Sequence, residues 1–190
     1  MVSLSFQICI NDCCNSLTVL DTTYLYSTDN LTGWGAPNTN LEDIVSATLN
    51  VITPNNDCVT LDILTEIQAQ SPITVDPIDL GFTDVILDGV YRFYVNINIG
   101  TEEEPEYITY ETTKLFYCNI NKKISNLIGT LDINGCCKPC KTGNAFDKVL
   151  LAWTYFQTLK NAACCGKIDT FNKLLTILNK LIDSKPCKNC

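Results

Sequence analysis

The chain contains no histidine among its 190 residues. Histidine is the side chain whose charge changes most readily near neutral pH, and it is the commonest protein ligand of transition metals. Its absence excludes a Ser-His-Asp triad or a Cys-His pair built from this chain alone. Because no other pair of nucleophile and base is visible in the sequence, we expect a protein that is not an enzyme.

Long hydrophobic runs are also missing. No apolar stretch approaches the roughly 18 residues that a transmembrane helix needs. The first residues, Met1 to Phe6, lack the basic segment that opens a secretory signal. We therefore expect no membrane partner and synthesis in a cytoplasm. A hydrophobic content of 46% is ordinary for a folded protein, so the chain should build a core.

Positive charge is scarce in the first part of the chain. Residues 1–118 hold only two cations, Arg92 and Lys114, with seventeen of the 21 carboxylates. Residues 119–190 hold eleven lysines and four carboxylates. This division predicts an acidic domain over 1–118 and a basic domain over 119–190. Copies of such a chain can attract one another head to tail, although two domains with unrelated solubility needs would show the same division.

The acidic part shows the two-residue period of β-strands. The clearest strand is Gly89–Ile99, where Tyr91, Phe93, Val95 and Ile97 alternate with polar residues, and Tyr107–Cys118 follows as its hairpin partner. Further strands are expected near residues 4–10, 17–20, 46–52, 59–64 and 73–75. Short strands separated by turn residues predict an antiparallel, immunoglobulin-like β-sandwich.

The basic part shows helical spacing instead. One helix is expected from Ile120 to Leu131 and a long one over Asn144–Cys164, with a last helix capped by Asp169. The long helix has Phe146, Val149, Leu150, Trp153, Phe156 and Leu159 on one predicted stripe. The last helix has Phe171, Leu174, Leu175, Leu178, Leu181 and Ile182. The short link at Gly166 makes the two antiparallel neighbours. The fold class is therefore α+β, a sandwich followed by a small cysteine-rich helical bundle.

Four of the twelve cysteines form two CxxC pairs, Cys137 with Cys140 and Cys187 with Cys190. An antiparallel hairpin would place both pairs at one end, where four thiolates could bind zinc. The pairs are 46 residues apart, however, and compact zinc sites have about 15–20. Free thiols, or disulfides that tie the ends of the bundle, are therefore the favoured interpretations over zinc. No other cofactor is indicated.

Two loops are candidate interface elements. Gly33–Asn38 carries the large aromatic Trp34, and the expected hairpin tip carries Glu102, Glu103 and Glu104 in succession. A run of glutamates at a hairpin tip is usually a solvated loop, and Trp34 could fill its own domain. The basic tail has lysine but no arginine, so we expect no specific recognition of nucleic acid.

Three short strings resemble structural proteins of tailed phages: Asp21-Thr22-Thr23, Gly33–Asn38 and Asp88-Gly89-Val90-Tyr91. More narrowly, the chain resembles a virion protein of the crAss-like phages of gut bacteria. The resemblance implies a non-enzymatic subunit of a ring of about twelve copies between portal and tail. Portal and tail proteins would be its partners, assembly would occur in the bacterial cytoplasm, and the genome would pass through the ring. The alternative is a zinc- or disulfide-stabilised adhesin or receptor-binding module.

The Trp34 hypothesis gives a first prediction. If Trp34 is an intermolecular anchor, Trp34→Ala should weaken assembly by about 2 kcal/mol per contact, because buried tryptophans dominate interface energies. Analytical ultracentrifugation of the variant measures this loss. A lower melting temperature with unchanged assembly would instead place Trp34 inside its own domain.

Overall fold

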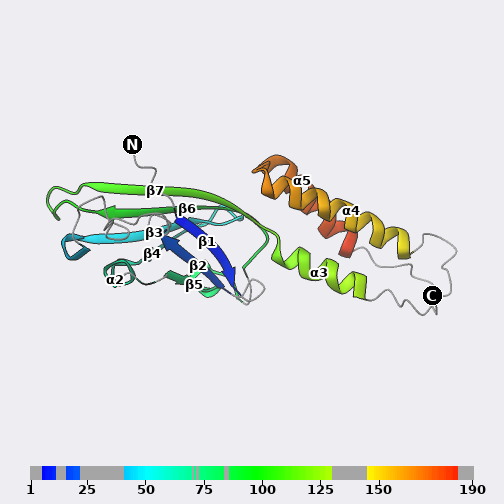
Figure 1. Ribbon diagram of the computed structural model, residues 1–190, viewed down its shortest axis with the longest axis horizontal. Coiled ribbons are helices and arrows are strands. Elements are labelled where there is room, and N and C mark those ends of the chain that lie inside the picture. Colours follow the sequence, from blue (N-terminus) through cyan, green and yellow to red (C-terminus); the bar gives the residue numbers. More distant parts are fainter. Residues whose placement is uncertain are drawn as a thin grey trace, which may run out of the picture. The chain divides into compact units, whose positions relative to one another are not determined.

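The computed structural model describes residues 6–11, 16–21, 41–69, 71, 73–83, 86–129 and 145–183 (Figure 1). The chain divides into two units. The first comprises Met1–Ile86 and Tyr91–Lys114, and the second comprises Leu87–Val90 and Leu115–Cys190. The boundary between the acidic and basic domains, predicted at residue 118, falls a few residues inside the second unit. The division crosses two strands, so the second unit also includes a short segment from the acidic part of the chain.

The first unit contains two sheets. The three-stranded sheet has the order β1-β2-β5, with β1 at Phe6–Asn11, β2 at Ser16–Asp21 and β5 at Ile73–Val75. The four-stranded sheet has the order β4-β3-β6-β7, with β4 at Cys58–Asp62, β3 at Ser46–Ile52, β6 at Gly89–Asn98 and β7 at Tyr107–Phe116. The strands pair antiparallel, as predicted, with Ala47 opposite Ile97 and Val51 opposite Phe93.

The two-residue period places one face of the four-stranded sheet in the core. Tyr91, Phe93, Val95 and Ile97 of β6 are all fully buried, and so are Leu49 and Val51 of β3. Between them, Arg92 is exposed and Tyr94 and Asn96 are half-buried. The alternation read from the sequence is therefore confirmed on β6 as far as Ile97, because each second side chain leaves water for the apolar interior. Asn98 was expected on the polar face with Arg92 and Asn96, but it is buried.

Short helices connect the strands: η1 at Leu41–Asp43, α2 at Leu64–Gln68 and η2 at Ile78–Leu80. The strand predicted over 59–64 was too long, because β4 ends at Asp62 and α2 begins two residues later. The Asp62 carboxylate accepts the backbone N–H of Leu64 at 3.1 Å. A carboxylate that satisfies a free N–H at a helix start favours the helix over a longer strand.

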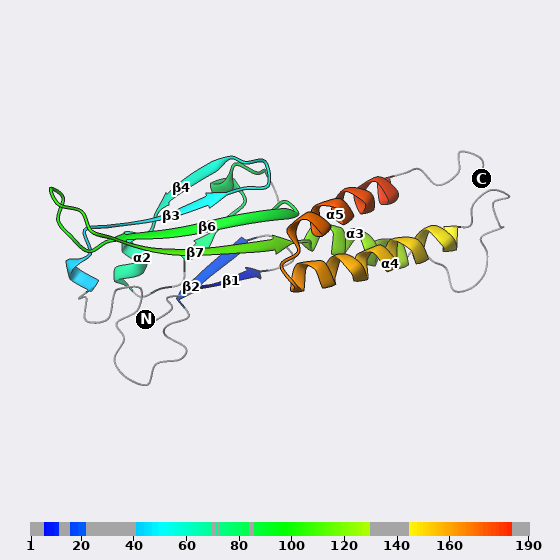
Figure 2. The same cartoon turned by 90° about the horizontal axis from the view of Figure 1, so that it is seen from above.

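The described residues of the second unit form three helices: α3 at Cys118–Gly129, α4 at Ala145–Cys164 and α5 at Ile168–Asp183. Their shared core is formed by Ile120, Ile124, Ala152, Phe156, Leu159, Ala162, Phe171, Leu174 and Leu178. The α4–α5 link contains Gly166, whose φ of 64° suits glycine. The Lys148 ammonium of α4 donates to the Ile182 carbonyl of α5 at 3.3 Å, so the helices are antiparallel, as predicted (Figure 2).

Two helical details differ from the predictions. Helix α5 begins at Ile168, so Asp169 lies inside its first turn and does not precede it as a cap. The apolar stripe predicted for α4 was partly wrong. Phe156 and Leu159 are buried, whereas Leu150 and Trp153 are 54% and 42% exposed. Apolar residues surround this helix on several sides, so their spacing does not select one inward face.

A carboxylate distant in sequence holds the start of α3. Asp88 accepts the backbone N–H of Asn119 at 2.8 Å and that of Ile120 at 2.6 Å. The first N–H groups of a helix have no partner inside the helix, and its N-terminus favours negative charge. Gly89 follows with a φ of 152°, which other residues rarely adopt. The Asp88-Gly89 pair therefore acts as a helix cap joined to a turn into β6.

Burial raises the pKa of the Asp88 carboxyl above its usual value of 3.8, although the two amide hydrogen bonds and the charge of Lys123 act in the opposite direction. A raised pKa means that the folded state holds this proton more tightly than the unfolded state. The resulting stabilisation is present below pH 3.8 and is lost as the pH rises through the raised pKa.

Replacement of this carboxylate should destabilise the helical unit. Asp88→Ala should lower the free energy of unfolding by about 1–2 kcal/mol, because it leaves two N–H groups of α3 without an acceptor. Asp88→Asn should lower it less, because its one carbonyl oxygen still accepts. Denaturant unfolding followed by circular dichroism measures both losses, and Glu111→Ala, on an exposed carboxylate of β7, is the control.

The pH dependence tests the same group. The stability difference between the native protein and Asp88→Asn should shrink as the pH rises from 3.8 through the raised pKa, since the amide cannot titrate. A difference that grew over this range would show that the pKa of Asp88 is lowered.

Candidate functional site

The strongest candidate for a contact site in the first unit is the loop between β6 and β7. Figures 1 and 2 show this loop projecting from the end of the two longest strands. Glu102, Glu103, Glu104 and Glu106 are all exposed, as is Thr101 at the start of the turn. No ion pair with a described residue is recorded for these four glutamates. The acidic tip, defined as Glu102–Glu104, therefore presents uncompensated negative charge to solvent.

A single buried side chain organises this loop. Asn98 is only 4% exposed, and its Oδ1 atom accepts the backbone N–H groups of Gly100 and Glu106, each at 3.0 Å. Its Nδ2 atom donates to the carbonyl of Thr101 at 3.3 Å. The amide thus satisfies three backbone groups on both sides of the loop. A buried polar group with this many partners keeps the loop in one conformation.

The turn itself closes on Thr101. Its backbone N–H donates to the Glu104 carbonyl at 3.0 Å, and its hydroxyl accepts the Glu104 N–H at 2.9 Å. The N–H of Ile99 donates to the Glu106 carbonyl at 2.8 Å and continues the hairpin ladder. These hydrogen bonds close the turn, so they hold the backbone that carries the acidic tip in one conformation.

Gly100 is required for steric reasons. A Cβ atom at this position would lie 2.3 Å from the Glu104 carbonyl oxygen and 2.5 Å from the Glu106 nitrogen. Both atoms belong to the backbone, so a side chain here would force the loop apart. Sequence reasoning identified the glutamates but missed Asn98 and Gly100, although the Asn-Ile-Gly string at the end of a strand was a usable signal of a specific turn.

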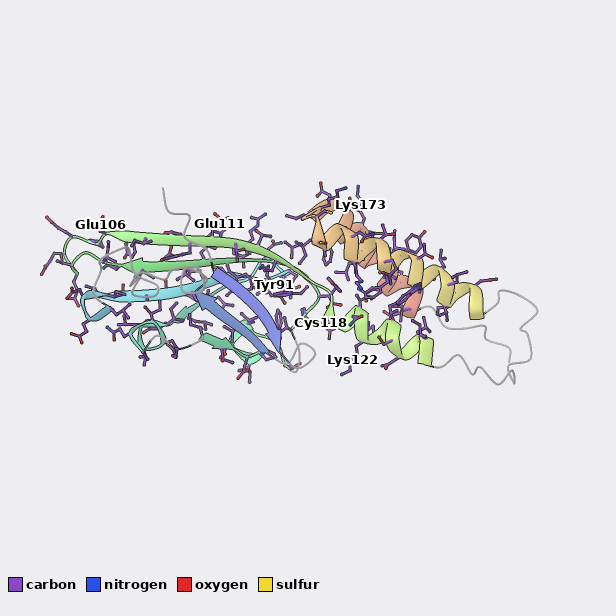
Figure 3. The ribbon with its side chains drawn as sticks, in the orientation of Figure 1. Tyr91, Glu106, Glu111, Cys118, Lys122 and Lys173 are labelled. Atoms are coloured by element: carbon purple, nitrogen blue, oxygen red, sulfur yellow. The ribbon has the colours of Figure 1, made fainter. Side chains whose placement is uncertain are left out.

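Negative charge continues along β7. Glu111 is exposed, and Tyr107 is 59% exposed beside Glu106. Figure 3 shows Glu106 and Glu111 directed away from the sheet. A large exposed aromatic next to a charged tip is a common composition for a protein interface.

The second unit carries exposed positive charge. Its exposed lysines are Lys122 and Lys123 on α3, Lys160 on α4, Lys167 in the link, and Lys173 and Lys180 on α5. Lys173 and Lys180 are seven residues apart and share one side of the helix, roughly 10 Å from each other along its axis. Figure 3 shows Lys122 and Lys173 pointing away from the bundle. Lys123 is partly neutralised by Asp183, 3.8 Å away.

The remaining predicted site residues lie outside the part of the chain that the structure describes. These are Trp34 and the cysteines Cys137, Cys140, Cys187 and Cys190. Within the described residues, Cys58, Cys118, Cys164 and Cys165 form no disulfide, and no group of three potential metal ligands occurs. The zinc, disulfide and thiol interpretations of the two CxxC pairs therefore stay predictions.

Among the described helices, none is long and apolar enough to cross a bilayer. Comparisons with protein-family models, with curated proteins and with solved structures gave no match. Function must therefore be inferred from this chain's own surfaces.

The tip geometry gives a direct test. Gly100→Ala should lower the free energy of unfolding of the first unit by about 1–3 kcal/mol, because its Cβ overlaps backbone atoms that cannot move independently. Thermal unfolding measures the loss. Glu103→Ala, an exposed change in the same loop, should leave the melting temperature nearly unchanged. Equal stability of the two variants would show that the loop is not closed as described.

Proposed function

We propose that this protein is a non-enzymatic structural subunit of a virion, which assembles into a ring in the head–tail connector or tail of a tailed phage. The observation that carries the proposal is the acidic tip, Glu102–Glu104, held rigidly on one unit of a chain whose other unit exposes lysines. A fixed group of like charges without ion-pair partners is suited to contact with an oppositely charged surface.

The contact would run head to tail. The acidic tip of one copy approaches the lysine row of the next copy, Lys173 and Lys180 on α5. Such a contact uses two different patches and is therefore heterologous, and heterologous contacts generate a ring when their rotation closes. The ring of about twelve copies that the phage resemblance implies is one such closed assembly.

The charges would set register and association rate more than affinity. Exposed ion pairs contribute little to stability and are screened by salt over about 10 Å at 0.1 M. Affinity must come from apolar contacts, and Tyr107 beside the tip is one such residue. The proposal therefore predicts assembly that depends strongly on ionic strength in its rate and more weakly in its final extent.

Two further elements of the proposal follow. We infer that the two sheets of the first unit pack as an immunoglobulin-like sandwich, because Ile73 and Val75 of β5 are buried like the inward residues of β6. The acidic surface of this unit would also avoid adhesion to a genome that passes through the ring. Portal and tail proteins would be the neighbouring partners.

Charge reversal at the tip tests the proposed contact. The triple variant Glu102→Lys, Glu103→Lys and Glu104→Lys should assemble at least tenfold more slowly at low salt, and the defect should diminish at high salt. Light scattering during assembly and native mass spectrometry of the product measure the rate and the size.

Two matched variants make this test specific. Reversal of Asp57, Asp76 and Glu111, three exposed carboxylates of the same unit away from the tip, changes the net charge equally and should have a smaller effect. Adding Lys173→Glu and Lys180→Glu to the tip variant should restore assembly, because the swapped charges again attract. A protein that remains a monomer at all salt concentrations would contradict the ring, and failure of the swap would contradict this pairing of surfaces.

A further inference from the structure

Helix α4 has an outer face that differs from the other exposed helical surfaces. Eleven consecutive residues, from Val149 to Leu159, carry no charge. Leu150, Leu151 and Trp153 are 54%, 46% and 42% exposed. Within about one turn, this helix therefore presents three large apolar side chains to solvent in addition to those it places in the core. An exposed apolar patch of this kind usually marks an interaction surface.

The two threonines on this face already use their hydroxyl hydrogens in bonds within the helix. The Thr154 hydroxyl donates to the Leu150 carbonyl at 2.9 Å, and the Thr158 hydroxyl donates to the Thr154 carbonyl at 3.0 Å. Both hydroxyls thus have a partner within the helix, so a covering surface need not supply a partner for either donor. Burial of this face would consequently leave few polar groups without a hydrogen bond.

The neighbouring helices do not share this character. Helix α5 exposes Lys173 and Lys180, and α3 exposes Lys122 and Lys123. Two copies that met through either helix would bring like charges together, which is unfavourable. The outer face of α4 is defined as Leu150, Leu151, Trp153, Thr154 and Thr158. Two copies can approach through this face without bringing like charges together.

We propose that this face binds the same face of a second copy, with the two α4 helices antiparallel. Charge complementarity fixes the direction. Lys148, directly before the uncharged stretch, directs its ammonium to the Ile182 carbonyl of α5, so the exposed charges that flank the stretch are Asp147 before it and Lys160 after it. In an antiparallel pair centred on Trp153 and Thr154, Asp147 of each copy lies level with Lys160 of the other, whereas a parallel pair places like charges side by side. The opposed helix dipoles favour the same direction.

This contact is distinct from the proposed ring contact and does not rest on it. An antiparallel helix pair relates two copies by a two-fold axis and is isologous, whereas the contact between tip and lysine row is heterologous. Together, the two contacts would join two rings through their helical units. Separately, the α4 contact would give a dimer that persists at high salt, because it depends on apolar burial and not on screened charges.

The test uses the full chain at high salt, where the charged contact is screened. Leu150→Glu places a charge on the face and should weaken the dimer at least tenfold, measured by sedimentation velocity over a concentration series. Ile177→Glu is the matched control, since Ile177 is 40% exposed on α5. It should change the dissociation constant less than twofold. Circular dichroism should show both variants folded.

A second measurement identifies the occupant. A photo-crosslinking amino acid in place of Thr154 should form crosslinks that mass spectrometry assigns to residues 150–157 of another copy. Crosslinks to the first unit alone, an unchanged mass for Leu150→Glu, or equal loss with Ile177→Glu would overturn the proposal. Flotation with anionic lipid vesicles covers the membrane alternative. If Leu150→Glu abolished vesicle binding without altering the mass, the face would bind lipid instead of a second copy.

Failure of this inference can be separated from failure of the ring. Reversal of the acidic tip should leave the high-salt dimer intact. Leu150→Glu should leave the salt-dependent step of assembly intact.

Discussion

The structure depends on side-chain oxygens that accept backbone N–H groups at the two ends of strand β6. Before the strand, the Asp88 carboxylate receives the N–H groups of Asn119 and Ile120. At its other end, the Asn98 amide receives those of Gly100 and Glu106. A buried N–H without a partner costs about 1–3 kcal/mol, so each of these side chains fixes a segment that the strand alone could not hold.

The consequences of these two bonds differ. Asp88 lies in the acidic part of the sequence but is hydrogen-bonded to the start of α3, and it therefore belongs to the helical unit. Asn98 orders the loop that carries the neighbouring glutamates. The hydrogen bonds to Asp88 support packing, since Ile120, which donates one of them, lies in the shared core of the helices. The hydrogen bonds to Asn98 order the backbone of the acidic tip. An ordered tip would lose less conformational entropy on binding another surface.

The surfaces of the two units suit contact of different kinds. Charged groups such as the acidic tip and the lysines of α5 give orientation and speed, but they are weakened by salt. The uncharged outer face of α4 would contribute affinity through apolar burial. Only Asp147 and Lys160, at its two ends, would favour one relative direction of the paired helices. The proposed function would need both kinds, and their separation on different elements would allow one contact to form while the other is absent.

The sequence by itself determined the local features of this protein. The two-residue period on Tyr91–Ile97 predicted β6, and the spacing of Phe171, Leu174 and Leu178 predicted the inward face of α5, because a single apolar stripe has only one favourable orientation. The charge division and the exposed glutamates were equally readable. Tertiary structure decided the rest. Asp88 acquires its role from N–H groups 31 and 32 residues away, and Asn98 is buried by the loop it organises. In α4, apolar residues surround the helix, so only packing against α3 and α5 decided that Phe156 enters the core while Leu150 and Trp153 face solvent. A pattern in one dimension cannot make that choice, because the neighbours that compete for each face come from distant parts of the chain.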